Sequence, residues 1–153
     1  MIELPEAQVL AGQMREMLTG KTITQVQVLQ SPHGFTFFHG DSQSYGMILQ
    51  GLTISGAAAF GGRPGLQFGD ELRLSFGDGA NLRYLAPGKK PPARHQLLLE
   101  FDDESALVCT VQMLGFIALF VSEHDSKNDE YYRAGVEKLS PHSNAFDLNY
   151  FNV

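Results

Sequence analysis

The chain has 153 residues, 43% of them hydrophobic, and its 11 Lys and Arg against 17 Asp and Glu give a formal net charge of −6. This length fits one domain with a substantial core. No apolar run reaches the ~18 residues of a transmembrane helix, and residues 1–6 are too acidic for a signal peptide. A single cysteine, Cys109, excludes a disulfide framework and a cysteine-built zinc site. We therefore expect a cytoplasmic protein that binds nucleic acid poorly through bulk charge.

The first predicted element is a helix over residues 4–19. Pro5 suits a first helical turn, where its missing N–H would be unpaired in any case. Apolar residues then recur at helical spacing, and Gly20 is a natural C-terminal stop.

Residues 22–29 are rich in β-branched side chains and roughly alternate, which predicts a strand. Residues 31–40 have the composition of a loop. Asp41 is a candidate N-cap for a short helix that Gly51 closes.

Short apolar segments separated by turn signals, such as Gly69-Asp70 and Pro87-Gly88, make up the chain from there to residue 121. This pattern predicts an α+β fold with a mostly antiparallel sheet. The predicted strands are residues 53–60, 66–68, 71–76, 81–85, 95–101, 106–113 and 116–121.

Near the C-terminus, Ser143 can cap a helix that carries Phe146, Tyr150 and Phe151 near one face. The chain stops at Val153 without a C-cap, and we therefore expect that more of the protein follows it.

Charge is segregated along the chain. Residues 79–99 contain four Lys and Arg and no acidic residue. Such asymmetry can create a one-sided positive surface, although a solvated loop beside a strand would have the same composition.

Several segments, taken in order, resemble the formamidopyrimidine-DNA glycosylase and endonuclease VIII family. They are the opening Glu3-Leu4-Pro5-Glu6, Gly20-Lys21-Thr22-Ile23, Leu52-Thr53-Ile54, residues 82–95 and residues 138–151. The resemblance covers essentially the whole chain, and no single motif is decisive.

This resemblance implies a two-layered antiparallel β-sandwich flanked by helices. Residues 1–139 would form the glycosylase-like N-terminal domain, and residues 140–153 would be a linker and the start of a helix leading to a C-terminal domain. The family carries its zinc finger in that second half, so zinc is expected there, and no metal or other cofactor is expected in this chain.

The implied function is base-excision DNA repair. Family members are DNA glycosylases with abasic-site lyase activity that excise oxidised bases from a damaged duplex, and we expect a monomer with no membrane contact. The chemistry needs an N-terminal amine that attacks the sugar, a carboxylic acid that moves protons and cations that hold phosphates. The target base must also leave the stack.

The resemblance places Glu3 and Glu6 at the acidic positions, although both could equally stabilise the positive end of the helix dipole. Ile2 stands where the family has its nucleophilic proline. The α-amine of Met1 is then the candidate nucleophile, so catalysis is expected to be weakened. Arg63 stands nearest the family's catalytic lysine, and a surface hairpin residue is the alternative interpretation.

The predicted DNA-backbone contacts are Lys89, Lys90, Arg94 and His95, of which the last two resemble a Lys-His pair of the family. Gln112, Met113 and Leu114 are candidates for an apolar wedge that enters the DNA stack, or for a strand end packed in the core. The family turn that carries its own wedge methionine corresponds to Gly77-Asp78-Gly79.

Two alternatives to the enzyme remain open. A non-catalytic derivative of the fold that binds damaged DNA or another nucleic acid would explain Ile2 and Asp78. A β-sandwich module for protein interaction would explain the negative charge.

Overall fold

A computed structural model gives the fold, and it describes residues 1–122, 125, 129–130 and 149. The helix predicted after Ser143 and the boundary predicted at residues 139–140 lie outside the described residues. The elements are α1 (Leu4–Leu18), β1 (Ile23–Val28), β2 (Thr36–His39), the short 3-10 helix η1 (Ser42–Ser44), α2 (Tyr45–Leu49), β3 (Gly56–Phe60), β4 (Arg63–Phe68), β5 (Leu72–Leu85), β6 (Leu97–Phe101) and β7 (Ala106–Phe120).

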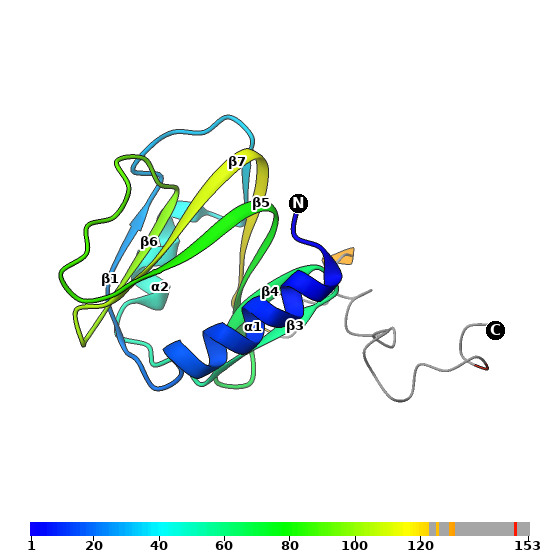
Figure 1. The fold of residues 1–153 in the computed structure, drawn as a ribbon, viewed down its shortest axis with the longest axis horizontal. Coiled ribbons are helices and arrows are strands. Elements are labelled where there is room, and N and C mark those ends of the chain that lie inside the picture. Colours follow the sequence, from blue (N-terminus) through cyan, green and yellow to red (C-terminus); the bar gives the residue numbers. More distant parts are fainter. Residues whose placement is uncertain (123–124, 126–128, 131–148, 150–153) are drawn as a thin grey trace.

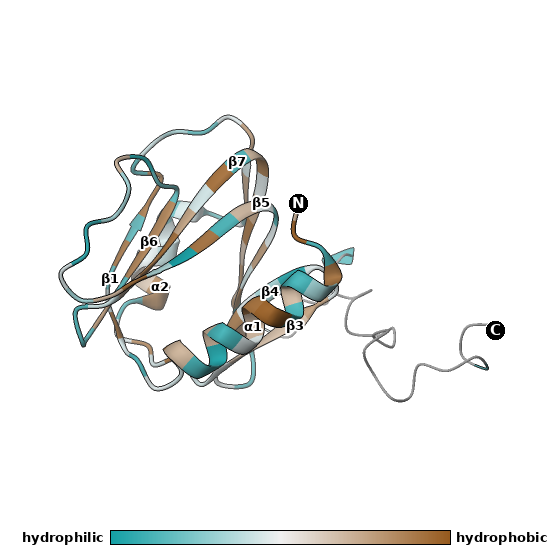
Figure 2. Cartoon of the chain, in the orientation of Figure 1, coloured by the Kyte–Doolittle hydropathy of each residue, from teal (hydrophilic) through white to brown (hydrophobic). Residues whose placement is uncertain are grey.

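Helix α1 forms where the sequence predicts it, because one of its faces is apolar. Ala7, Ala11, Met14 and Leu18 are buried on that face, and the helix packs on β3 and β4 (Figure 1). The alternation of hydrophobic and hydrophilic residues along the helix is visible in Figure 2. The short helix is confirmed as well, since the Asp41 carboxylate accepts a hydrogen bond from the Gln43 N–H at 3.0 Å.

The strands β5 and β7 are longer than predicted, because each joins two of the predicted segments into one strand. All seven strands belong to one hydrogen-bonded sheet in the order β1-β6-β7-β5-β4-β3, with β2 also on β7. β2 lies in the segment predicted to be a loop, and it pairs parallel to β7. Its four residues are too few for the alternation that marks a strand in sequence.

The two long strands give the sheet two layers. The Leu82 half of β5 and the Cys109 half of β7 pair with each other beside β6 and β1. The Leu74 half of β5 and the Ile117 half of β7 pair beside β4, β3 and β2. This arrangement confirms the predicted α+β, mostly antiparallel fold, and Figure 1 shows both long strands curving from one layer to the other.

A bulge marks the point where β5 and β7 pass between the layers. Asp78 pairs with Gly115, and the next pair is Ala80 with Val111. Residues 112–114 therefore face a single residue of β5 and are displaced from the ladder. Such bulges increase the local bend of a strand pair and re-aim side chains.

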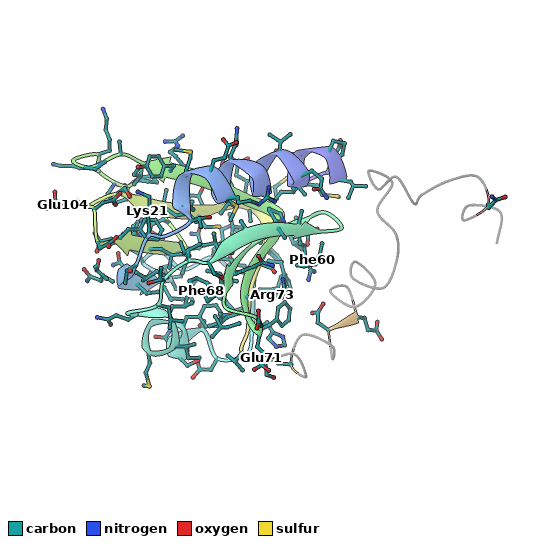
Figure 3. All side chains as sticks on the ribbon, turned by 90° about the horizontal axis from the view of Figure 1, so that it is seen from below. Lys21, Phe60, Phe68, Glu71, Arg73 and Glu104 are labelled. Carbon is teal, nitrogen blue, oxygen red and sulfur yellow. The ribbon has the colours of Figure 1, made fainter. Side chains whose placement is uncertain are left out.

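The main hydrophobic core lies between the layers and reaches the N-terminus, since it includes Ile2. A smaller cluster on the other face of β7 contains Ala118 and Phe120, with Phe60 and Phe116 against it. Arg73 covers part of this cluster, with its Cζ 4.9 Å from the centroid of the Phe60 ring (Figure 3). Among the described residues, no helix is both long and apolar enough to span a membrane.

Candidate functional site

A cleft of about 320 Å³ opens beside the N-terminus, next to the bulge. Its walls come from the first residues of the chain and α1, from the middle of β5, and from the bulged part of β7. The lining residues are Met1, Ile2, Glu6, Leu10, Asp78, Gly79, Ala80, Asn81, Leu82, Gln112 and Met113.

The side chain of Ile2 anchors the chain terminus to the cleft floor. It is only 7% exposed and belongs to the main core, and the Ile2 N–H donates a hydrogen bond to the Asp78 carbonyl oxygen at 2.8 Å. Met1, by contrast, is 91% exposed. Its α-amine stands one residue, about 3.8 Å of chain, from the nitrogen of residue 2, which here is a hydrogen-bonded amide.

The two predicted acids take different places. Glu6 lines the cleft, and its Oε2 accepts a hydrogen bond from the Glu3 N–H at 3.4 Å. Glu3 is exposed and is not among the lining residues. Asp78 adds a second carboxylate to the wall, so Glu6 and Asp78 are the acids nearest to the cleft, and the second of them was not predicted as a site residue.

The lining residues include no Lys or Arg. Two carboxylates and the α-amine of Met1 are therefore the ionisable groups that the described part of the chain brings to this cleft. Such a wall disfavours a phosphate at the cleft floor and tolerates uncharged groups. The described residues hold no group of three or more His, Cys, Asp or Glu side chains placed for a metal ion.

The bulged residues project from the sheet. Met113 is 88% exposed and Leu114 is 44% exposed, and Gln112 is exposed as well. The alternative in which these residues pack in the core is wrong for Met113 and Leu114, because the bulge lifts them off the ladder.

Glycine is required opposite the bulge. A Cβ atom on Gly79 would lie 2.2 Å from the Gln112 carbonyl oxygen and 2.4 Å from that of Leu114. Both contacts are to backbone, which cannot swing aside. The sequence signal for this position is the Gly-Asp-Gly run, which resembles a turn but lies inside β5, opposite the bulge of β7.

Arg63 is not among the residues that line the cleft, and its side chain is only 12% exposed. Its guanidinium lies over the Phe116 ring, with Cζ 4.2 Å from the centroid, and Nη1 is 3.6 Å from the Asp129 carboxylate. It packs so closely on Gly77 that a Cβ atom there would meet Arg63 Nε at 3.0 Å. Arg63 does lie in the β3–β4 hairpin, where it pairs with Phe60. The alternative of a hairpin residue therefore holds, except that the Arg63 side chain is mostly covered by its contacts with Phe116, Asp129 and Gly77.

The basic segment lies at the other end of β5. Lys89, Lys90 and Arg94 are exposed in the loop between β5 and β6. The extended chain from Asp78 to Leu85 covers roughly 20 Å at ~3.3 Å per residue, and Figure 1 places this loop on the opposite side of the molecule from the N-terminus. These cations could reach only a phosphate well removed from the cleft.

His95 is buried, with 4% of its surface exposed. Its Nδ1 is 3.1 Å from the Pro92 carbonyl oxygen and its Nε2 is 3.2 Å from Gln27 Oε1. Both ring nitrogens are thus engaged in holding the loop against β1, and the structure removes His95 from the predicted surface contacts. His95 stands between a polar loop and an apolar strand, and at such a position the sequence does not distinguish a surface DNA contact from a buried structural histidine.

No family model matches the chain, and no curated protein matches it. Solved structures do. The Lactococcus lactis formamidopyrimidine-DNA glycosylase in complex with DNA that contains FAPY-dG is 22% identical at a TM-score of 0.67, covering 80% of this chain and 45% of that one. The chain has the fold of that enzyme's N-terminal domain.

Two further complexes agree with this assignment. The Lactococcus lactis enzyme with DNA that contains an abasic site is 22% identical at a TM-score of 0.66. A MutM bound to DNA with carbocyclic 8-oxo-G is 21% identical at 0.62. Each match covers 80% of this chain and 45% of the other. The predicted resemblance is confirmed as a shared fold, and the chain spans less than half the length of these relatives.

Proposed function

We propose that this chain is the N-terminal domain of a base-excision repair protein that recognises damaged DNA through the cleft at Met1 and Ile2, with its lyase chemistry lost or strongly weakened. Support comes from the fold, which it shares with proteins solved on lesion-containing and abasic-site DNA. Further support comes from the cleft itself, which brings the α-amine, a carboxylate and an exposed apolar protrusion together.

One observation carries the loss of lyase chemistry. Attack on an abasic sugar needs a free amine at a set position. At residue 2 the nitrogen is an amide that already donates to the Asp78 carbonyl oxygen, and the Ile2 side chain is buried beneath it. The α-amine of Met1 is displaced by about 3.8 Å, whereas a misplacement of ~1 Å can cost about 100-fold in rate.

The remaining groups favour recognition over catalysis. Glu6 lines the same cleft as Met1. Arg63, however, cannot lose its proton at neutral pH and is packed against Phe116 and Asp129. The exposed cations of the loop after β5 lie far from the cleft. We therefore expect weak binding of intact duplex at ~150 mM salt. With few contacts between cations and phosphates, the affinity should also depend only weakly on salt concentration.

The test combines intact mass with borohydride trapping on abasic-site DNA. The wild type, with Met1 retained, should give no adduct. The Ile2→Pro variant, with Met1 removed, places a secondary amine at residue 2 and should give an adduct that maps to that residue. Ile2→Ala is the matched control, because it exposes a primary amine at the same position.

Two results would overturn the proposal. Trapping by the wild type as efficient as by Ile2→Pro would show that the chemistry has survived on Met1. Equal binding of abasic-site and intact duplex at ~50 mM salt, where phosphate contacts are least screened, would remove damage recognition. The lesion class, the monomeric state and the cytoplasmic location stay predictions.

A further inference from the structure

The strand β2 is an edge of the sheet that the described part of the chain leaves open. β1 and β3 end the main strand order, whereas β2 pairs with β7 alone. At β3, helix α1 packs on the strand, and Arg15 Nε donates to the Ala57 carbonyl oxygen at 3.1 Å. At β1, helix α2 packs on the strand, and the Ile23 N–H donates to the Leu52 carbonyl oxygen at 2.9 Å. No described residue covers the outer edge of β2 in this way.

The main chain of β2 offers hydrogen-bonding groups at this open edge. The Phe35 carbonyl oxygen accepts from the Gly115 N–H at 3.0 Å. Peptide groups of alternate residues in a strand point to the same edge, so those of Phe37 also face β7 and those of Thr36 and Phe38 face outward. The Thr36 N–H accordingly donates to a carbonyl oxygen of the preceding turn, at 3.2 Å. The open edge thus presents the carbonyl of Thr36 and both the N–H and the carbonyl of Phe38.

The side chains of β2 make this edge apolar and uncharged. Residues 34–40 contain no Lys, Arg, Asp, Glu or Pro, and charged residues and proline are among the means by which edge strands avoid pairing with another chain. Phe37 is 47% exposed and pairs in the ladder with Phe116, which packs on the small cluster of Ala118 and Phe120. A strand added beside β2 would therefore extend an apolar face that Phe37 leaves exposed.

We infer that the open edge of β2 binds an extended, uncharged segment of a partner protein, which adds a strand to the sheet. Main-chain donors and acceptors along a sheet edge favour an extended chain, and the side chains beside them select alternating apolar residues. A second copy of this chain fits less well, because the four residues of β2 extend about 13 Å at ~3.3 Å per residue, and a stable dimer buries about 800 Å² on each partner. Binding at this edge needs no DNA and goes beyond the proposed function.

The experiment titrates a fluorescein-labelled peptide of alternating threonine and valine with the full chain and follows fluorescence anisotropy. A peptide of the same composition with its valines contiguous is the control ligand and should bind more weakly. Phe37→Lys places a charge at the edge and should weaken binding of the alternating peptide by about fivefold or more. Met47→Lys is the matched control and should leave binding unchanged, since Met47 is 87% exposed on α2, away from β2.

Two further readouts test pairing through the main chain. Methylation of every backbone nitrogen of the alternating peptide removes its donors while keeping its side chains, and it should abolish binding. In hydrogen exchange followed by NMR, the Phe38 amide should become protected when the unmethylated peptide binds, because its N–H faces the open edge. The Phe37 amide faces β7 and should keep its exchange rate.

Several results would overturn the inference. They are binding of neither peptide, equal binding of both peptides, retained binding of the methylated peptide, and equal affinities of Phe37→Lys and Met47→Lys for the alternating peptide. Self-association of the wild type in sedimentation that Phe37→Lys removes would identify a second copy of the chain as the occupant of the edge, and it would likewise contradict the inference.

Discussion

Replacing Gly79 with alanine tests whether the bulge is as tightly packed as the structure shows. The added Cβ atom would lie 2.2 Å and 2.4 Å from two backbone oxygens of β7, about 1 Å inside an ordinary contact. Relief requires β5 and β7 to separate where they cross between the layers. Overpacking typically costs about 1–3 kcal/mol, and because both neighbours are backbone atoms we expect a loss near ~3 kcal/mol.

The same chemical change at Gly12 provides the control. Gly12 lies inside α1, and a Cβ atom there would meet no heavy atom within 4 Å. Alanine should raise the free energy of unfolding by roughly 0.5–1 kcal/mol, since it is the better helix former. The two Gly→Ala variants should therefore differ by roughly 4 kcal/mol and lie on opposite sides of the wild type.

Urea unfolding followed by circular dichroism measures both variants. In thermal melts, Gly79→Ala should lower Tm by roughly 6–12 °C, at ~2–4 °C per kcal/mol for a chain of this size. If Gly79→Ala unfolds within ~0.5 kcal/mol of the wild type, the close approach of the strands is wrong. If both variants shift in the same direction, the effect comes from the unfolded chain and not from the collision.

Three further predictions concern two buried side chains, Tyr45 and Cys109, and one exposed carboxylate, Asp103. Tyr45→Phe removes the buried hydroxyl that accepts from the Leu119 N–H at 3.0 Å and should lower the unfolding free energy by about 1–3 kcal/mol in urea titrations, because a buried donor is left unpaired. Burial raises the pKa of the Cys109 thiol to about 12, so the thiol of the unfolded chain ionises at lower pH than that of the folded protein. The free energy of unfolding should therefore fall as pH rises from about 9 towards 12, and Cys109→Ala should show a smaller fall. The hydrogen bond from Lys21 holds the pKa of Asp103 well below its ordinary range, so its stabilising contribution is present above pH ~4 and is lost on acidification. Asp103→Asn should therefore reduce the fall of the unfolding free energy below pH ~4. A fall as steep as that of the wild type would refute this prediction.

Local patterns in the sequence predicted most of the elements, because local forces determine them. The apolar face of α1 and the carboxylate of Asp41 act within a few residues, so their helices form where expected. Turn signals at Gly69-Asp70 and Pro87-Gly88 separate strands correctly. The resemblance to the glycosylase fold, built on scattered short segments, also agrees with the solved structures.

The same reasoning failed where partners distant in sequence decide the outcome. Asp78-Gly79 resembles a turn, but pairing with β7 makes it a bulge inside one long strand. β2 forms through its parallel pairing with β7, and a pattern of four residues is too short to predict such a strand. His95 and Arg63 are polar residues that suggest a surface position, yet His95 is buried against Gln27 of β1 and the guanidinium of Arg63 lies over the Phe116 ring.

The sequence by itself determined the residue types at the terminus, including isoleucine at the position of the expected proline, because identity is local information. Only the tertiary structure decided what that exchange does. In the folded protein Ile2 is buried in the core, and its N–H donates to the Asp78 carbonyl oxygen. Met113, in the bulge of β7, lines the same cleft. These contacts join residues more than seventy positions apart, and only the packing of β5, β7 and α1 brings such residues together.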